Sequence, residues 1–277
     1  MKTLSIDVGI KNLAYCLLDD HKIERWGVVN LIEDLKKSCD LSTKNVKCAN
    51  DAKFKKNDTY YCTKHAKKEE FIIPTNETKK STINKMTIAD LQSLAIKYNI
   101  TQSPATKKSE LVAELYDYFK TQAFESVENI NAGEVDLVIL GKALKTKFDE
   151  IFNTECVIEC VIIENQISPI ANRMKTIQGM IAQYFIMKNS DIRVEFISAS
   201  NKLKLGLTES GTPNAQSINN MTYNQRKKLG VEKCAEFIRS SYTEWYQFFI
   251  NNKKKDDLAD AFLQGKWFLA KVRNGER

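Results

Sequence analysis

The sequence predicts a mixed α/β fold that is interrupted by a long insertion. Three short runs of apolar and β-branched residues, at 3–8, 13–18 and 23–32, open the chain with polar turns between them. This spacing is typical of an antiparallel meander of three strands. A fourth run, at 156–164, is dominated by apolar residues, as in a strand buried on both faces in the middle of a sheet.

Helices alternate with strands in the second half of the chain, which favours a sheet covered by helices. Before the fourth run, apolar residues recur at helical spacing from Val135 to Ile151. After it we expect, in order, a helix at about 174–187, a strand at 192–198, a polar loop at 208–222, and helices at about 225–240 and 257–272.

The alternation stops between residues 33 and 131. A structureless loop of about 100 residues is implausible inside a compact domain, so we expect two inserted modules. The first is rich in lysine and holds three of the seven cysteines, and the second has two short amphipathic helical patterns. These boundaries divide the chain into a core domain at 1–35 and 128–277, a first module at 36–80 and a second module at 83–122.

Composition and charge exclude several classes of protein. With 43% hydrophobic and 28% charged residues, the 277-residue chain is neither disordered nor fibrous. No apolar run approaches the roughly 20 residues that a membrane span requires. Asp7 interrupts the first apolar run, which leaves no legible signal or transit peptide, so we expect an intracellular protein. The odd number of cysteines then favours free thiols or metal ligands over disulfides.

The net charge of +7, from 42 basic and 35 acidic residues, is modest. The excess lies in two blocks, at 44–85 and 202–255. Such blocks are compatible with a nucleic-acid path and equally with solvated loops and helix faces.

Several acidic residues occur where burying a carboxylate would be unfavourable without a partner, or where the residue could be either structural or catalytic. Asp7 lies within the first predicted strand, and Glu164 ends the fourth apolar run. Asp257 and Asp260 are three residues apart on the last helix and therefore share a face. Asp256 and Asp257 would also suit a helix start without any catalytic role. Gathered together, such carboxylates repel one another unless a divalent cation neutralises them, as in two-metal phosphodiester hydrolases.

Three motifs carry a resemblance to a known family: SIDVGIKNLA at 5–14, IENQ at 163–166 and KKDDLADAF at 254–262. Together they resemble the RuvC-like Holliday junction resolvases, in particular the branch of poxviruses, other large DNA viruses and fungal mitochondria. The resemblance implies an RNase H-like mixed five-stranded sheet with flanking helices and a long insertion after the third strand. It further implies a homodimer that cuts four-way DNA junctions with paired symmetric nicks during DNA recombination or repair. For a viral protein, the host cytoplasm or nucleus is the expected compartment.

The resemblance assigns the catalytic and metal-binding roles to Asp7, Glu164, Asp257 and Asp260, with two Mg²⁺ or Mn²⁺ ions per active site. Asp256 remains an alternative ligand, because adjacent aspartates leave the register open by one position. We expect hydrolysis by a water on one metal while the second stabilises the leaving 3′ oxygen. Candidate phosphate contacts, which any surface basic residue could equally provide, are Lys11, Arg173, Lys202, Lys204, Arg226, Lys227 and Lys228.

The first inserted module carries a possible zinc site. Cys39, Cys48, Cys62 and His65 form Cys-x8-Cys-x13-Cys-x2-His, in which the last step is a good chelating knuckle and the x8 step is unusually wide. Structural zinc is favoured because this lysine-rich stretch is too polar to fold on a core of its own. Scattered free thiols are the alternative.

The second module resembles a SAP domain, a small DNA-binding helical motif, over residues 86–119. In that case Lys107 and Lys108 would contact the phosphate backbone. The usual glycine before the central lysine is absent, with Ala105-Thr106 in its place, so a plain helical hairpin remains an alternative.

Other functions also remain open on the sequence. They are an RNase H-like nuclease for other branched DNA or for RNA, and a non-catalytic junction-binding protein. An actin-like kinase is disfavoured because the chain lacks the further glycine-rich loops that its phosphate site needs. The helix at 174–187 could supply a dimer face, or it could be a core helix.

Overall fold

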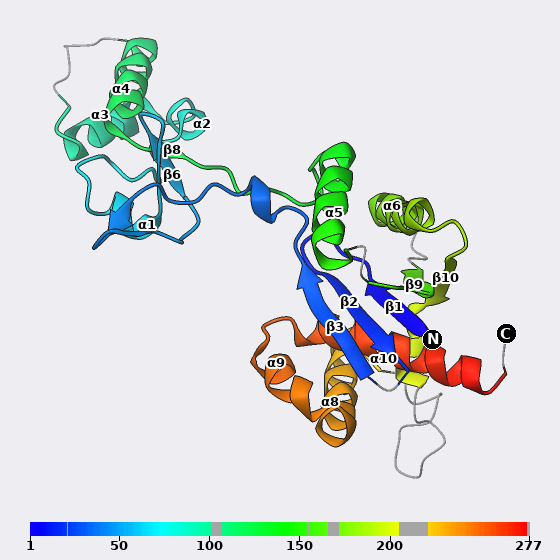
Figure 1. The fold of residues 1–277 in the computed structure, drawn as a ribbon. Helices are drawn as coiled ribbons and strands as arrows, with labels where there is room; N and C mark the ends of the chain where they lie inside the picture. Colours follow the sequence, from blue (N-terminus) through cyan, green and yellow to red (C-terminus); the bar gives the residue numbers. More distant parts are fainter. Residues whose placement is uncertain (21, 101–106, 154–155, 166–171, 205–220, 276–277) are drawn as a thin grey trace. The chain divides into compact units, whose positions relative to one another are not determined.

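The computed structural model describes the chain except residues 21, 101–106, 154–155, 166–171, 205–220 and 276–277 (Figure 1). It consists of two compact units. Met1–Glu33 and Asn131–Arg277 form the core unit, and Asp34–Ile130 forms the inserted unit. The prediction of a mixed α/β fold with an insertion after the third strand is confirmed. Among the described residues, no helix is both long and apolar enough to cross a membrane.

A five-stranded mixed sheet forms the centre of the core unit. Its order is β10-β9-β1-β2-β3. The first three strands form the predicted antiparallel meander, and β9 and β10 run parallel to β1. This arrangement is a mixed five-stranded sheet, as the resemblance implies. The strands are β1 (Lys2–Asp7), β2 (Leu13–Asp19), β3 (Lys22–Val29), β9 (Cys160–Asn165) and β10 (Arg193–Ser198).

Strand β9 is shorter than the predicted run at 156–164. It begins only at Cys160, whose backbone pairs with Thr3 of β1. Just before it, the amide of Glu159 donates to the Lys2 carbonyl at 3.0 Å. From Cys160 to Glu164 every residue is buried, as expected for a strand covered on both faces.

Helices cover both faces of the sheet. Figure 1 shows α5 and α6 on one side and α8, α9 and α10 on the other. The 3-10 helices η3 and η4 and the helix α9 had no counterpart in the sequence prediction. The bounds are α5 (Leu137–Ile151), α6 (Asn172–Lys188), η3 (Ala199–Lys204), α8 (Tyr223–Ser241), η4 (Thr243–Trp245), α9 (Tyr246–Asn251) and α10 (Lys255–Arg273).

Helix α10 is fixed against the sheet over most of its length. Its residues Leu258 and Phe262 are fully buried in the same apolar cluster as Ala14 of β2. The indole nitrogen of Trp26 donates to the Leu258 carbonyl at 3.1 Å. At Gly265, a Cβ atom would lie 2.6 Å from Leu18 and 3.2 Å from Ser5, so glycine permits this close approach of helix and sheet.

The inserted unit combines two small β-sheets with short helices. Two hairpins turn at Lys44–Asn45 and Asn57–Asp58, where all four residues have positive φ, as in type I′ turns. Its elements are β4 (Ser42–Thr43), β5 (Val46–Lys47), β6 (Phe54–Lys56), β7 (Thr59–Tyr61), α1 (Thr63–Ala66), α2 (Lys80–Ile83), α3 (Ile88–Lys97), α4 (Lys108–Gln122) and β8 (Glu125–Ser126), besides η1 (Glu33–Leu35) at the boundary between the units.

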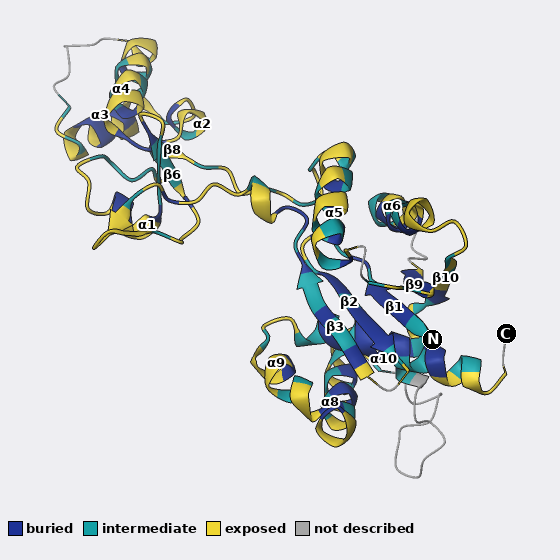
Figure 2. Cartoon of the chain, in the orientation of Figure 1, coloured by how far each residue is buried: buried dark blue, intermediate teal, exposed yellow. Residues whose placement is uncertain are grey.

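Both predicted modules lie within this single compact unit. Helices α3 and α4 share an apolar core that includes Leu91, Leu94 and Leu115 (Figure 2). Strand β6 of the first module pairs with β8, which follows α4. The buried Lys56 of β6 donates to three carbonyls at the end of α4, those of Lys120, Thr121 and Ala123. The hydrogen bonds therefore join the two modules.

Candidate active site and metal centre

The four predicted acidic residues come from three elements of the core unit. Asp7 ends β1, and Glu164 is the second-last residue of β9. Because these strands are parallel neighbours with Ile6 opposite Ile163, the two carboxylates leave the sheet at the same edge. Asp257 and Asp260 lie in the first turns of α10, which packs on β1 and β2.

The ammonium group of Lys202 lies among three of these carboxylates. Its Nζ is 2.7 Å from Glu164 Oε2, 3.0 Å from Asp260 Oδ2 and 3.4 Å from Asp7 Oδ1. The lysine side chain is only 7% exposed. Lys202 belongs to η3, which follows the end of β10 directly. The sequence predicts this lysine as a phosphate contact, but the structure has it neutralising the acid cluster, because a buried ammonium needs close anionic partners.

Burial and close contacts shift the pKa of each group in this cluster. Burial raises the pKa of Asp7 well above its usual range, against the pull of Lys202, and the hydrogen-bonded Glu164 raises it further. The pKa of Glu164 is lowered despite burial, since Asp7 and Lys202 both bond to it. Burial alone would lower the pKa of Lys202, yet the surrounding acids raise it. The ammonium group of Lys202 thus supplies positive charge among these acids.

Asp257 lies outside this ion-pair cluster. It lines a pocket of about 480 Å³ together with Asp7, Gly9 and Asn12. Its Oδ2 is buried and has no hydrogen-bond partner among the residues that the structure describes. Burial, followed by the neighbouring Asp256, raises the pKa of Asp257. A buried, unpaired carboxylate oxygen is unfavourable on its own, and a hard divalent cation would satisfy it.

The structure gives the two adjacent aspartates different surroundings. Asp256 Oδ2 accepts a hydrogen bond from Lys227 Nζ at 2.6 Å. It does not line the pocket that Asp257 shares with Asp7. The helix starts at Lys255, two residues before the predicted start, and this places both aspartates in its first turn.

The carboxylate oxygens of the four acids do not all lie within 4.8 Å of one another in the described structure. Within the described ranges, the one group of His, Cys, Asp or Glu ligand atoms that all lie within 4.8 Å of one another is Cys39, Cys48, Cys62 and His65. Three of the carboxylates, those of Asp7, Glu164 and Asp260, instead lie around the ammonium group of Lys202.

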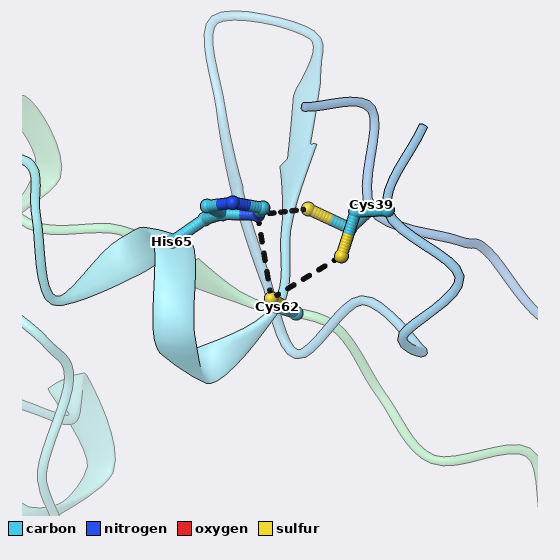
Figure 3. Close-up of side chains that lie close together, drawn as sticks. Cys39, Cys62 and His65 are labelled. Atoms are coloured by element: carbon cyan, nitrogen blue, oxygen red, sulfur yellow. Dashed lines mark hydrogen bonds between the residues drawn. The ribbon is translucent and has the colours of Figure 1, made fainter. Parts of the chain in front are cut away.

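The four ligand atoms of the cysteine and histidine group all lie within 4.8 Å of one another, as a single zinc ion requires (Figure 3). Cys39 Sγ and Cys62 Sγ lie 3.2 and 3.6 Å from His65 Nδ1, and Cys48 Sγ lies 3.9 Å from Cys62 Sγ. Zinc with bonds of about 2.3 Å to sulfur and about 2.0 Å to nitrogen separates its ligand atoms by roughly 3.6–3.8 Å. The residues therefore fit a zinc ion.

Neighbouring groups orient these ligands. Thr43 Oγ1 lies 3.0 Å from His65 Nε2 and leaves Nδ1 directed at the sulfur atoms. Asn50 Nδ2 donates to Cys48 Sγ at 3.3 Å. Although burial opposes it, backbone N–H groups lower the pKa of Cys62, which favours the thiolate that binds metal.

The other predicted basic residues occupy several positions. Lys11 and Arg173 line the same pocket as Asp7 and Asp257. Arg226 and Lys228 are exposed on α8. Lys107 precedes α4 and Lys108 begins it, both at its start; the preceding residues 101–106 lie outside the described part. The side chain of Lys204 and the motif residue Gln166 are also outside it.

Sequence reasoning missed one further interaction at the site. With the Asn12 amide oriented to satisfy both of its hydrogen bonds, its oxygen accepts from Lys254 Nζ at 3.1 Å. Asn12 lies in the first motif and Lys254 in the third, so the pairing could have been suspected from the motifs, but only the fold brings the two together.

Comparisons with known proteins place resolvases among the similar structures. The chain is similar to the yeast mitochondrial Holliday junction resolvase Ydc2, with 16% identity, 99% of this chain and 82% of that chain covered, and a TM-score of 0.41. It is also similar to the fowlpox virus resolvase, solved with substrate Holliday junction DNA, with 13% identity, 98% and 99% covered, and a TM-score of 0.44.

One relative is similar in sequence. The uncharacterized protein L451 of Acanthamoeba polyphaga mimivirus is 25% identical over 311 aligned residues, which cover 97% of this chain and 74% of the relative. No protein-family model matches the chain. Neither comparison assigns a function, so the side chains of the candidate site must indicate it.

Proposed function

We propose that this chain is a metal-dependent endodeoxyribonuclease that resolves four-way DNA junctions. One observation carries the proposal: the acids of β1, β9 and α10 gather with a buried lysine at one edge of an RNase H-like sheet. A carboxylate cluster that needs external positive charge, next to an open pocket, suits the binding of metal and phosphate together.

The residues fit Mg²⁺ or Mn²⁺. Asp7, Glu164, Asp257 and Asp260 would hold two ions, and the unpaired Oδ2 of Asp257 is the oxygen that most needs one. When bound, the ions activate the attacking water and stabilise the leaving 3′ oxygen.

The remaining roles belong to the protein's own side chains. Lys202 holds Asp7, Glu164 and Asp260 in place against their mutual repulsion. Gly9 permits the close approach of the Asn12 backbone, since a Cβ there would lie 2.5 Å from the Asn12 carbonyl oxygen. Lys11 and Arg173, which line the same pocket, would orient the phosphodiester for attack.

Resolution of a junction requires two symmetric cuts and hence two active sites, so we propose a homodimer. Helix α6 offers an apolar surface for it. Ile186 and Met187 are 41% and 78% exposed at its end, whereas Ile177 and Ile181 on its other face are buried. One face of α6 therefore packs in the core, and the apolar residues at its end would contact a second copy of the chain.

The inserted unit would bind DNA and would take no part in the cleavage reaction. We propose that Cys39, Cys48, Cys62 and His65 hold a structural zinc ion, which replaces a core in this polar segment. The α3–α4 pair would act as a SAP-like module, with Lys107 and Lys108 on the phosphate backbone.

Cleavage of synthetic junctions tests the proposal. Four-way junctions labelled on each strand are incubated with the purified chain and Mg²⁺, and the products are mapped to the nucleotide. We expect paired nicks on opposing strands, which are lost in Asp7→Asn and retained in Asp20→Asn, a matched change at an exposed acid of the core unit. Nicks that survive Asp7→Asn would refute the assignment.

A substrate panel separates the alternatives. Preferred cutting of flaps, replication forks or RNA hybrids would identify a nuclease with another branched substrate. Tight junction binding without cleavage in either Mg²⁺ or Mn²⁺ would identify a non-catalytic binding protein.

A further inference from the structure

A second pocket lies next to the acid cluster within the core unit. It has a volume of about 540 Å³ and lies where α8 meets the segment that joins α9 to α10. Lysine and asparagine side chains dominate its wall, namely Lys227, Lys228, Asn251, Asn252, Lys253 and Lys255. We call it the lysine pocket.

The lysine pocket carries uncompensated positive charge. Its lining holds four lysines and one acid, Asp256, so 4 − 1 leaves three positive charges. The carboxylate of Asp256 is already paired with Lys227, whose Nζ lies 2.6 Å from Asp256 Oδ2. Lys228 has a loose ion pair with Glu232 at 3.7 Å, and both side chains are mostly exposed, so this pair neutralises little. Within the described part of the chain, Lys253 and Lys255 have no ion pair.

Concentrated like charges favour an anionic ligand. Lysines that face one concave surface repel one another, and a bound anion relieves that repulsion. The amides of Asn251 and Asn252 can add neutral hydrogen bonds to an oxygen of the ligand. Lysine ammonium groups act as point charges, which suits a phosphodiester that is bound without regard to base sequence.

The start of α10 forms a common wall between the lysine pocket and the acid site. Asp256 lines the lysine pocket, and the next residue, Asp257, lines the pocket that contains Asp7. Lys254, two residues before Asp256, donates to Asn12, which lines the acid-site pocket. A DNA strand that lies across these few residues would enter one pocket and leave by the other.

We infer that the lysine pocket binds a backbone phosphate of the substrate strand beside the phosphodiester that is cut. This inference rests on the proposed function and adds the path of the strand to it. By holding a neighbouring phosphate, Lys253 and Lys255 act as positioning residues that set which phosphodiester lies at Asp7 and Asp257.

Junction binding by a non-cleaving chain tests the inference. Asp7→Asn is combined with Lys253→Gln and Lys255→Gln, and the dissociation constant is measured from 50 to 300 mM NaCl. The matched control removes Lys22 and Lys142 in the same way, since both are exposed on the core unit outside both pockets. We expect about ten-fold weaker binding than the control. The slope of log K against log salt should become shallower by about 0.9 for each phosphate that the variant no longer neutralises.

A second readout uses the chain with Asp7 intact. Without a grip on the neighbouring phosphate, the variant should spread its cuts over more positions, whereas Lys253→Arg with Lys255→Arg should keep both the affinity and the cut position. Affinity and salt slope equal to those of the control would overturn the inference. Because binding is measured without cleavage, a chain that never cuts DNA would refute the proposed chemistry and leave this test intact.

Discussion

Replacing Lys202 by methionine should expose how the acid cluster is stabilised. The substitution keeps most of the apolar stem but removes the ammonium that lies 2.7–3.4 Å from three carboxylates. At these distances and an effective dielectric constant of about 20, each pair contributes roughly 5–6 kcal/mol before desolvation is subtracted. Since the partner charges remain buried, we expect a net loss of about 3–5 kcal/mol in unfolding free energy.

The three tryptophans make the measurement specific. Trp26, Trp245 and Trp267 all belong to the core unit, so tryptophan fluorescence during urea unfolding reports that unit and not the inserted one. At pH 7 with EDTA, Lys202→Met should unfold at lower urea than the unchanged chain. Lys142→Met, at an exposed position, should stay within about 0.5 kcal/mol.

The effect should depend on pH with a defined sign. Removing positive charge raises the pKa of Asp7, Glu164 and Asp260, so the folded variant binds more protons than the unfolded chain. Its stability therefore rises as pH falls from 7 toward 5. In the unchanged chain, the raised pKa of Lys202 means that its contribution is fully present below its unfolded value of about 10.4 and is lost only above it. A variant as stable as the unchanged chain at pH 7, or one that acid does not restore, would refute this account of the cluster.

Three further outcomes follow from the structure. Asp257→Asn should abolish Mg²⁺-dependent cleavage while Asp256→Asn, whose partner is Lys227, should reduce it less than ten-fold; equal losses in product formation would contradict the assignment. Metal analysis after dialysis should find one zinc per chain, lost in Cys62→Ser, and less than one zinc per two chains would rule out the four-ligand site. Lys56→Met should lower the unfolding free energy of the inserted unit by about 2–4 kcal/mol, because it leaves three carbonyls without their donor. Circular dichroism during urea unfolding measures this loss. An equal loss in Lys53→Met, at an exposed position, would show that the loss is not due to these bonds.

Asp7 can be singled out from the sequence because it breaks a strong local rule. A carboxylate within a buried strand, such as Asp7, conflicts with its apolar neighbours and is therefore visible without a structure. The meander and the central strand were also predictable, from short apolar runs separated by polar turns. The start of α10 was missed by two residues, because no side chain caps the helix at Lys254 and the first turn is held by tertiary contacts such as Trp26 to Leu258.

The wide spacing in the zinc motif has a simple physical explanation. The eight residues between Cys39 and Cys48 form the β4–β5 hairpin, whose turn at Lys44–Asn45 brings its ends together. A hairpin returns the chain to its starting point, so a long step in sequence is a short one in space. The small strands of the inserted unit carry too few apolar residues for periodicity to reveal them.

The ion pairs of Lys202 could not be predicted, because a lysine in a sequence carries no sign of its partners. Only the parallel pairing of β9 and β10 puts η3, and with it this side chain, beside Glu164. Its position changes the interpretation of the acid cluster. Divalent ions that bind there must compete with an ammonium, since both satisfy the same carboxylates. Because burial raises the pKa of Asp7, metal affinity should increase as the pH rises, and the lysine keeps the acids assembled until the metal arrives.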